Sequence, residues 1–286
     1  MQTVFFGTSR YSAKFLELII KNGLKINLVV SAPPKPIGRK QILAENPTTI
    51  IANKLKIPKA TSPKDLMVKQ FKNLTIGIML DFNQIISQEI INLFSRGIIN
   101  IHFSKLPKYR GPSPIQQTIL NGDKEAWITY FLITEKLDEG PILSQTSLPL
   151  SGTETTESLY NIMIEKASQE IKKIINDYLN ERIKPYPQSN NPSYTHKLLF
   201  KDTKIDWKQS PQKIERLIRA AYPEPGAWTE VIFNNQKPIK KKLKILKSHL
   251  ENGKLALDEV QLEGKKPVTW KQFKEGYPNA LLNTNS

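Results

Sequence analysis

The stretch Ile98-Ile-Asn-Ile-His-Phe-Ser-Lys-Leu-Pro-Lys-Tyr-Arg-Gly111 contains a strand and the loop that follows it. The first residues are apolar, except that Asn100 and His102 interrupt the run. Side chains two residues apart lie on the same face of a strand, so Asn100 and His102 point one way and Ile101 the other. The pattern predicts a buried strand over 98–102 that carries an amide and an imidazole near its carboxyl end.

Around this strand, short β-type runs alternate with apolar residues at helical spacing. This rhythm predicts an α/β domain with a mostly parallel, Rossmann-like sheet. In such sheets ligands bind beyond the carboxyl ends of the strands, where His102 lies. The first turn, Phe6-Gly-Thr-Ser9, lacks two glycines of the dinucleotide fingerprint, so a nicotinamide cofactor is not expected. The predicted elements are strands at 3–6, 27–30 and 75–80 and helices at 12–22, 48–55 and 87–94.

The second half of the chain changes character after a long amphipathic helix predicted at 156–181. Residues 184–193 are rich in Pro, Ser and Asn, which is typical of an extended linker. A helix and several short strands follow, and they predict a smaller OB-like β-barrel. The predicted strands are 130–133, 142–148, 228–233, 243–248 and 255–262, and the second helix is 211–221. The predicted organisation is a catalytic domain at 1–183, a linker at 184–203 and a C-terminal domain at 204–286.

Composition limits the classes of function. The chain has no cysteine and three histidines that are far apart, so neither thiolate chemistry nor a His-based metal cluster is expected. The longest apolar runs are too short to cross a bilayer, and the first residues resemble a strand rather than a secretory leader. These features predict a cytoplasmic protein without membrane segments.

The formal net charge of +16 admits two interpretations. Lysine, asparagine and isoleucine are abundant, as in AT-rich coding sequences, and lysine improves solubility. Alternatively, the charge attracts a polyanion such as nucleic acid. Because the lysines are spread along the whole chain, the charge alone fits both.

A carboxylate that could serve Asn100 and His102 lies further along, at Asp138. Asp and Gly are ordinary residues of a hairpin turn, which accounts for Asp138 without any function. Equally, a carboxylate can orient an imidazole and stabilise its charge. His102 and Asn100 also have a plain alternative, as a core histidine and a strand-end cap. Sequence spacing does not decide whether Asp138 and His102 meet.

Several motifs together resemble the formyltransferases that use 10-formyltetrahydrofolate. That superfamily carries an Asn, His and Asp triad in this order, and the likeness extends over nearly the whole chain. Within the superfamily, the chain looks most like the methionyl-tRNA formyltransferases, whose second domain its C-terminal motifs match. The matching motifs are Asn100-Ile-His102, Ser104-Lys-Leu-Pro107, Tyr109-Arg-Gly111, Pro114-Ile-Gln116, Leu137-Asp138-x-Gly140, Ile205-Asp-Trp207, Arg216-x-x-Arg219-Ala220, Pro223-x-Pro225-Gly226-Ala-Trp228 and 264–273.

The resemblance implies transfer of a formyl group from 10-formyltetrahydrofolate to the amino group of initiator methionyl-tRNA, which yields N-formylmethionyl-tRNA for translation initiation. It implies that Asn100, His102 and Asp138 are catalytic, that the folate co-substrate binds without any metal, and that the enzyme is a monomer. The folate-binding residues would be Ser104, Lys105, Leu106 and Pro107. A formyltransferase that acts on a nucleotide-linked amino sugar is the alternative, and a non-catalytic tRNA-binding protein is a third.

A basic, Pro-rich segment at 32–43 resembles the loop that reaches the tRNA acceptor stem in methionyl-tRNA formyltransferases. Within it, Arg39 and Lys40 are the expected tRNA contacts, although the segment alone also fits a Pro-stiffened surface loop. The chain departs from the family pattern at Pro34-Lys35, at Lys105 and at Asp81-Phe-Asn-Gln84, where the family has an Ala-Tyr-Gly type of sequence.

Overall fold

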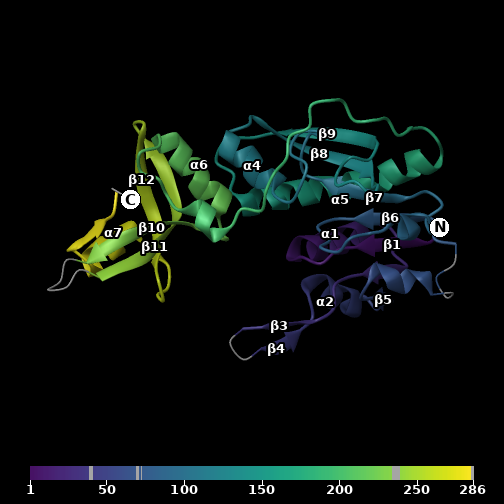
Figure 1. The fold of residues 1–286 in the computed structure, drawn as a ribbon, viewed down its shortest axis with the longest axis horizontal. Coiled ribbons are helices and arrows are strands. Elements are labelled where there is room, and N and C mark those ends of the chain that lie inside the picture. Colours follow the sequence, from purple (N-terminus) through teal and green to yellow (C-terminus); the bar gives the residue numbers. More distant parts are fainter. Residues whose placement is uncertain (39–40, 69–70, 72, 234–238, 285–286) are drawn as a thin grey trace. The chain divides into compact units, whose positions relative to one another are not determined.

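A computed structural model describes residues 1–38, 41–68, 71, 73–233 and 239–284 (Figure 1). Arg39 and Lys40 lie outside the described residues, so their role stays a prediction. The chain divides into two compact units. The first unit contains Met1–Gly111, Trp127–Leu148 and Tyr160–Tyr194, and the second contains Pro112–Ala126, Pro149–Leu159 and Thr195–Ser286.

The first unit is built on a seven-stranded sheet with the order β5-β2-β1-β6-β7-β8-β9. Neighbouring strands from β5 to β7 are parallel, and β8 runs antiparallel to β7. This confirms the prediction of a mostly parallel α/β sheet. The strands are β1 (Thr3–Phe6), β2 (Leu28–Val30), β5 (Lys59–Ala60), β6 (Ile76–Met79), β7 (Ile98–His102), β8 (Glu125–Leu132) and β9 (Ile142–Pro149).

Helix α1 (Arg10–Lys21) shows how local sequence fixes these elements. The Ser9 side chain accepts hydrogen bonds from the backbone N–H groups of Tyr11 and Ser12, and this cap starts the helix. The helix buries Phe15, Leu16 and Ile19, of which Ile19 lies about one turn after the other two, together with other side chains. Removing an aliphatic or aromatic side chain of this size from water contributes about 1.5–3 kcal/mol. The other helices are α2 (Pro47–Lys54), α3 (Gln88–Ile91) and α5 (Thr156–Leu179).

Helix α3 is shorter than the helix predicted at 87–94. After Ile91 the chain tightens into three-residue turns, in which Leu93 donates to the carbonyl of Ile90 and Phe94 to that of Ile91. The chain then reverses at Gly97, whose φ of +71° favours glycine. No helix within the described residues is long and apolar enough to cross a membrane.

The second unit contains a curled antiparallel sheet with the order β13-β12-β11-β10-β14 (Figure 1). Helix α6 packs against it with Ile214 and Ile218 buried, which confirms the small β-rich domain expected at the C-terminus. The elements are α4 (Pro114–Asn121), α6 (Pro211–Ala221), β10 (Ala227–Phe233), β11 (Ile239–Glu251), β12 (Lys254–Leu262), β13 (Val268–Thr269), α7 (Trp270–Gly276) and β14 (Ala280–Leu282).

The Pro-rich segment contains a two-stranded ribbon that the sequence did not predict. Strands β3 (Lys35–Ile37) and β4 (Ile42–Ala44) pair antiparallel, with Pro36 opposite Leu43. Ile42 and Leu43 leave 63% and 69% of their surfaces exposed.

Candidate active site

Strand β7 carries Asn100 and His102, the two polar residues of the stretch 98–102. All five of its residues are buried, and Asn100 and His102 are 9% and 7% exposed. In the sheet Asn100 lies between Met79 of β6 and Phe131 of β8. The alternation of a strand places the two polar side chains on one face, away from Ile101. The predicted strand and its shared polar face are therefore confirmed.

His102 is oriented by the loop that follows its strand. Its Nε2 atom lies 2.9 Å from the carbonyl oxygen of Tyr109. A carbonyl can only accept a hydrogen bond, so Nε2 carries the proton in the neutral ring. The lone pair is then on Nδ1, which lies 3.8 Å from Oδ2 of Asp138. A proton that arrives at Nδ1 creates an imidazolium facing a carboxylate.

Asp138 comes from the turn between β8 and β9, and the structure brings it to His102 from 36 residues away in the sequence (138 minus 102). Its Oδ2 accepts a hydrogen bond of 2.7 Å from the backbone N–H of Gly111. Asp138 has a φ of +52°, a left-handed conformation that costs a non-glycine residue about 1–2 kcal/mol. In the same turn, a Cβ on Gly140 would lie 1.7 Å from the carbonyl oxygen of Leu132, so only glycine fits.

The carboxamide of Asn100 differs from these two side chains, because it makes no side-chain hydrogen bond to any described residue. It lies on the same face of β7 as His102. Its amide atoms are not among the fully buried side-chain atoms that lack a partner, so they reach the molecular surface. A donor without a partner, beside an imidazole that can accept a proton, suits a carbonyl oxygen supplied by a substrate.

The four residues expected to bind folate divide into two kinds. Ser104 and Leu106 hold the loop itself: the Ser104 hydroxyl donates to the carbonyl of Lys108 at 2.6 Å, and Leu106 packs against Phe131. Lys105 is exposed, with its ammonium 4.0 Å from the centre of the Trp127 ring. Pro107 is partly exposed. Only Lys105 and Pro107 therefore present side chains for a ligand.

Arg110 has no role that its motif predicts, yet it lies beside the catalytic candidates. Arg110 is 6% exposed, and its guanidinium lies 2.8 Å from the carboxylate of Glu139. This ion pair joins the turn after β7 to the turn that holds Asp138. In the sequence, the only sign of this ion pair was that residues 110 and 139, in the two turns that carry catalytic candidates, have opposite charges.

The segment Asp81-Phe-Asn-Gln84, which departs from the family pattern, is fixed in the fold. Phe82 packs edge-on against Phe6, with ring centres 5.5 Å apart. Gln84 donates a side-chain hydrogen bond to the carbonyl of Thr61. Burial, together with the nearby Asp81 carboxylate, raises the pKa of Tyr160 above its ordinary value. The Phe82 ring thus packs, partly buried, against the core, whereas Asp81 remains exposed.

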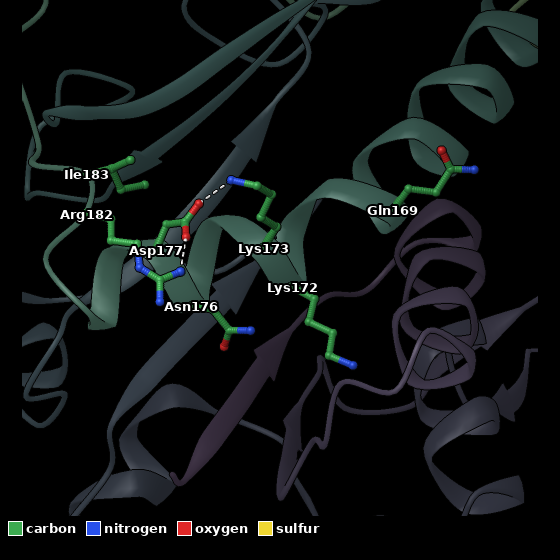
Figure 2. Close-up of a pocket in the computed structure, with 7 residues that line it drawn as sticks. All are labelled: Gln169, Lys172, Lys173, Asn176, Asp177, Arg182 and Ile183. Atoms are coloured by element: carbon green, nitrogen blue, oxygen red, sulfur yellow. Dashed lines mark hydrogen bonds and ion pairs between the residues drawn. The ribbon is translucent and has the colours of Figure 1, made fainter.

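A depression of about 710 Å³ lies at the end of α5 and is lined by none of the catalytic candidates (Figure 2). Figure 2 shows Lys173 and Arg182 reaching Asp177 from two sides. The hydrogen bond from Lys173, assisted by that from Arg182, lowers the pKa of Asp177 below its ordinary value of 3.8. Because Lys173 and Arg182 both pair with Asp177, we infer that these three side chains stabilise the end of α5.

Asp177→Asn is expected to lower Tm by a few degrees at neutral pH. A lowered folded-state pKa means that the carboxylate stabilises the fold above about pH 4, and that this contribution disappears as the pH falls through the lowered pKa. Thermal unfolding of both proteins from about pH 7 to about pH 3 measures the effect, with Glu125→Gln on the exposed part of β8 as the control. A Tm difference that persists unchanged at about pH 3 contradicts this account.

The described residues contain no group of three or more His, Asp or Glu side chains that could hold a metal ion. The Nδ1 atom of His249 lies 2.9 Å from Oδ1 of Asp258, where β11 pairs with β12, and this pair is one histidine and one carboxylate.

Two family models match the chain. The formyl transferase model matches residues 1–175, and the model of the formyl transferase C-terminal domain matches residues 197–256. A methionyl-tRNA formyltransferase of Thermodesulfovibrio yellowstonii is 34% identical over 293 residues, which cover 96% of this chain and 95% of that protein.

Solved structures also match. WlaRD, a sugar 3N-formyl transferase, is 26% identical with a TM-score of 0.65, and the match covers 94% of this chain and 97% of that one. A methionyl-tRNA formyltransferase from Clostridium thermocellum is 20% identical with a TM-score of 0.59, over 92% of this chain and 99% of that one. Since a family model covers more than half of the sequence and a relative above 30% identity covers nearly all of it, the chain belongs to the formyltransferase family, among the methionyl-tRNA formyltransferases.

Proposed function

We propose that the chain transfers the formyl group of 10-formyltetrahydrofolate to the amino group of initiator methionyl-tRNA. The observation that carries the proposal is the match to a methionyl-tRNA formyltransferase along 96% of the chain. A net charge of +16 suits a polyanionic acceptor. A formyl donor based on folate is supported by WlaRD, whose structure was solved with 5-N-formyl-THF. The chain acts in the cytoplasm, as a monomer.

The catalytic residues in this proposal are Asn100, His102 and Asp138. The amine nitrogen attacks the formyl carbon, the carbon–N10 bond of the folate breaks, and a proton moves from the amine to N10. Asn100 donates a hydrogen bond to the formyl oxygen, and the bond strengthens as that oxygen becomes anionic. His102 accepts the amine proton at Nδ1 and returns it to N10. Asp138, 3.8 Å away, stabilises the imidazolium between the two steps.

Binding of the two substrates is divided along the chain. The folate lies beside Ser104–Pro107, where Lys105 and Pro107 offer exposed side chains and Ser104 and Leu106 shape the loop. The proposed domains are a catalytic domain at 1–183, a linker at 184–203 and a tRNA-binding domain at 204–286. The two family matches, at 1–175 and 197–256, support this division.

One assay separates this function from its alternative. The structural match to a sugar 3N-formyl transferase favours an amino sugar on a nucleotide as the second candidate acceptor. Purified protein would be offered 10-formyltetrahydrofolate with charged initiator tRNA and, in parallel, with nucleotide-linked amino sugars. We expect formylation of methionyl-tRNA. Formylated amino sugar with unmodified tRNA would overturn the proposal.

Arg39→Ala is expected to raise the KM for methionyl-tRNA roughly tenfold or more, since hydrogen bonds to charged groups contribute about 1.5–3 kcal/mol. The prolines before Arg39 restrict the backbone and reduce the entropy lost on docking. A guanidinium can bind a phosphate through two donors or stack on an unpaired base, which Lys imitates poorly. The KM for folate should change little.

The measurement is initial rate against tRNA concentration at two salt levels, with folate saturating. The deficit should shrink as salt rises, because part of the lost contact is counterion release. Lys21→Ala, at the exposed end of α1, removes a cation outside the Pro-rich segment and is the control. Unchanged tRNA dependence in Arg39→Ala would remove this segment from the tRNA contact.

A further inference from the structure

The segment at 186–194 lies between the two family matches, which end at 175 and begin again at 197. It is extended, and it belongs to the first unit together with β7. Tyr186 exchanges two backbone hydrogen bonds with Ile142, the first residue of β9. At its other end, Tyr194 forms a parallel bridge with Arg110. The segment therefore runs along the turns that carry the catalytic candidates.

Gln188 is the residue of this segment that joins both turns. Its Nε2 atom donates to the carbonyl oxygens of Asp138 and Gly140, at 2.8 and 2.9 Å. Its Oε1 atom accepts from Nη2 and Nε of Arg110, at 2.8 and 3.2 Å. One carboxamide thus uses two donors on the turn after β8 and its acceptor on the turn after β7.

Those two turns are the ones that orient the imidazole. The carbonyl of Tyr109 accepts from Nε2 of His102, and the N–H of Gly111 donates to Asp138. Tyr109 and Asp138 both have positive φ values, +62° and +52°, which non-glycine residues hold only when their surroundings fix them. Gln188 bonds the neighbour of Tyr109 on one side and Asp138 itself on the other.

Ser193 supplies a second, independent contact to the same turn. Its hydroxyl accepts from the backbone N–H of Tyr109 at 2.9 Å, and its carbonyl accepts from that of Arg110 at 2.8 Å. In return, the N–H of Ser193 donates to the carbonyl of Pro107. The turn after β7 is thus bonded to the segment at 186–194 through main-chain groups as well as side chains.

We infer that Gln188 is a positioning residue for formyl transfer, which holds the turns of Tyr109 and Asp138 in the arrangement that keeps the His102 proton on Nε2 and Nδ1 facing the carboxylate. The inference rests on the proposed function. Gln188 is assigned no contact with either substrate. Its effect passes through His102 and Asp138, and a misplacement of about 1 Å in reacting groups can lower the rate about a hundredfold.

The amide is the group that this position requires. Glutamate has nearly the same shape and can still accept from Arg110, but it has no N–H to donate to the carbonyls of Asp138 and Gly140. It would also place a negative charge against two carbonyl oxygens and near the carboxylate of Asp138. Gln188→Glu therefore removes the hydrogen bonds to Asp138 and Gly140 and keeps those from Arg110.

For Gln188→Glu we expect kcat to fall about 10- to 100-fold while both KM values change less than about threefold. Steady-state rates with methionyl-tRNA and 10-formyltetrahydrofolate measure this split. Nitrogen-15 NMR of the imidazole of His102 gives a second readout. In the wild type the proton is on Nε2, and in the variant it should be shared between both ring nitrogens. Gln169→Ala, on the exposed face of α5, is the matched control.

Ser193→Ala removes a contact to the same turn without adding charge, and decides the matter if Gln188→Glu fails to fold. It should lower kcat in the same way, to a smaller extent. Wild-type kcat and an unchanged His102 spectrum in the folded variants would overturn the inference, as would a raised KM with normal kcat. If the wild type formylates no tRNA, the proposed function fails, yet the His102 spectrum still tests the positioning role.

Discussion

His102→Ala is expected to lower the turnover of methionyl-tRNA formylation by about two to four orders of magnitude, the range typical of a positioned acid and base. The expectation rests on two contacts, the bond from Nε2 to the Tyr109 carbonyl and the approach of Nδ1 to Asp138 at 3.8 Å. Without the ring, the amine proton has no protein group at this position to receive it. The Asp138 carboxylate then has no imidazolium to stabilise.

Single-turnover rates with both substrates saturating measure this loss, because binding no longer limits them. Circular dichroism and Tm show whether the variant stays folded, as expected for a side chain on the site face of β7. His196→Ala changes an exposed histidine of the second unit and should leave the rate unchanged. Near-normal turnover in His102→Ala would exclude the imidazole from the reaction.

The strand that carries the site was predictable from sequence because it depends on local pattern. The alternation in Ile98–His102 follows from strand geometry, and the burial of the isoleucines follows from their apolar surface. The bounds of strand β11 were harder to predict from the sequence. It extends from Ile239 to Glu251, whereas the prediction was 243–248. Its first residues after Ile239 are exposed lysines, which carry no apolar alternation.

The meeting of Asp138 with His102 was beyond local pattern. It depends on the antiparallel pairing of β8 with β7, in which His102 lies opposite Thr129, and on the turn that follows β8. The role of Gln188 is harder still to predict. Gln188 lies 50 residues after Asp138 in the sequence (188 minus 138), and its side chain bonds the backbone carbonyl of Asp138. Every residue type has a backbone carbonyl, so a contact to one leaves no pattern in the sequence.

Asn100→Ala is expected to lower the catalytic rate by roughly two to three orders of magnitude, with little change in folate affinity. Among the described residues the Asn100 carboxamide has no side-chain hydrogen-bond partner, and it shares the face of β7 with His102. An N–H donor there interacts weakly with a neutral formyl oxygen and strongly with the anionic oxygen of the tetrahedral intermediate. The loss should therefore fall on kcat rather than on substrate binding.

Asn100→Asp provides the sharper comparison, because it preserves shape, removes the N–H donor and adds a negative charge where negative charge develops. We expect it to lose at least as much rate as Asn100→Ala. Asn176→Ala, on the exposed end of α5, is the matched control. Folate affinity is measured by titration and the rate under saturation. If Asn100→Ala binds folate poorly yet keeps its saturated rate, Asn100 binds the co-substrate, and the oxyanion must be stabilised by another donor.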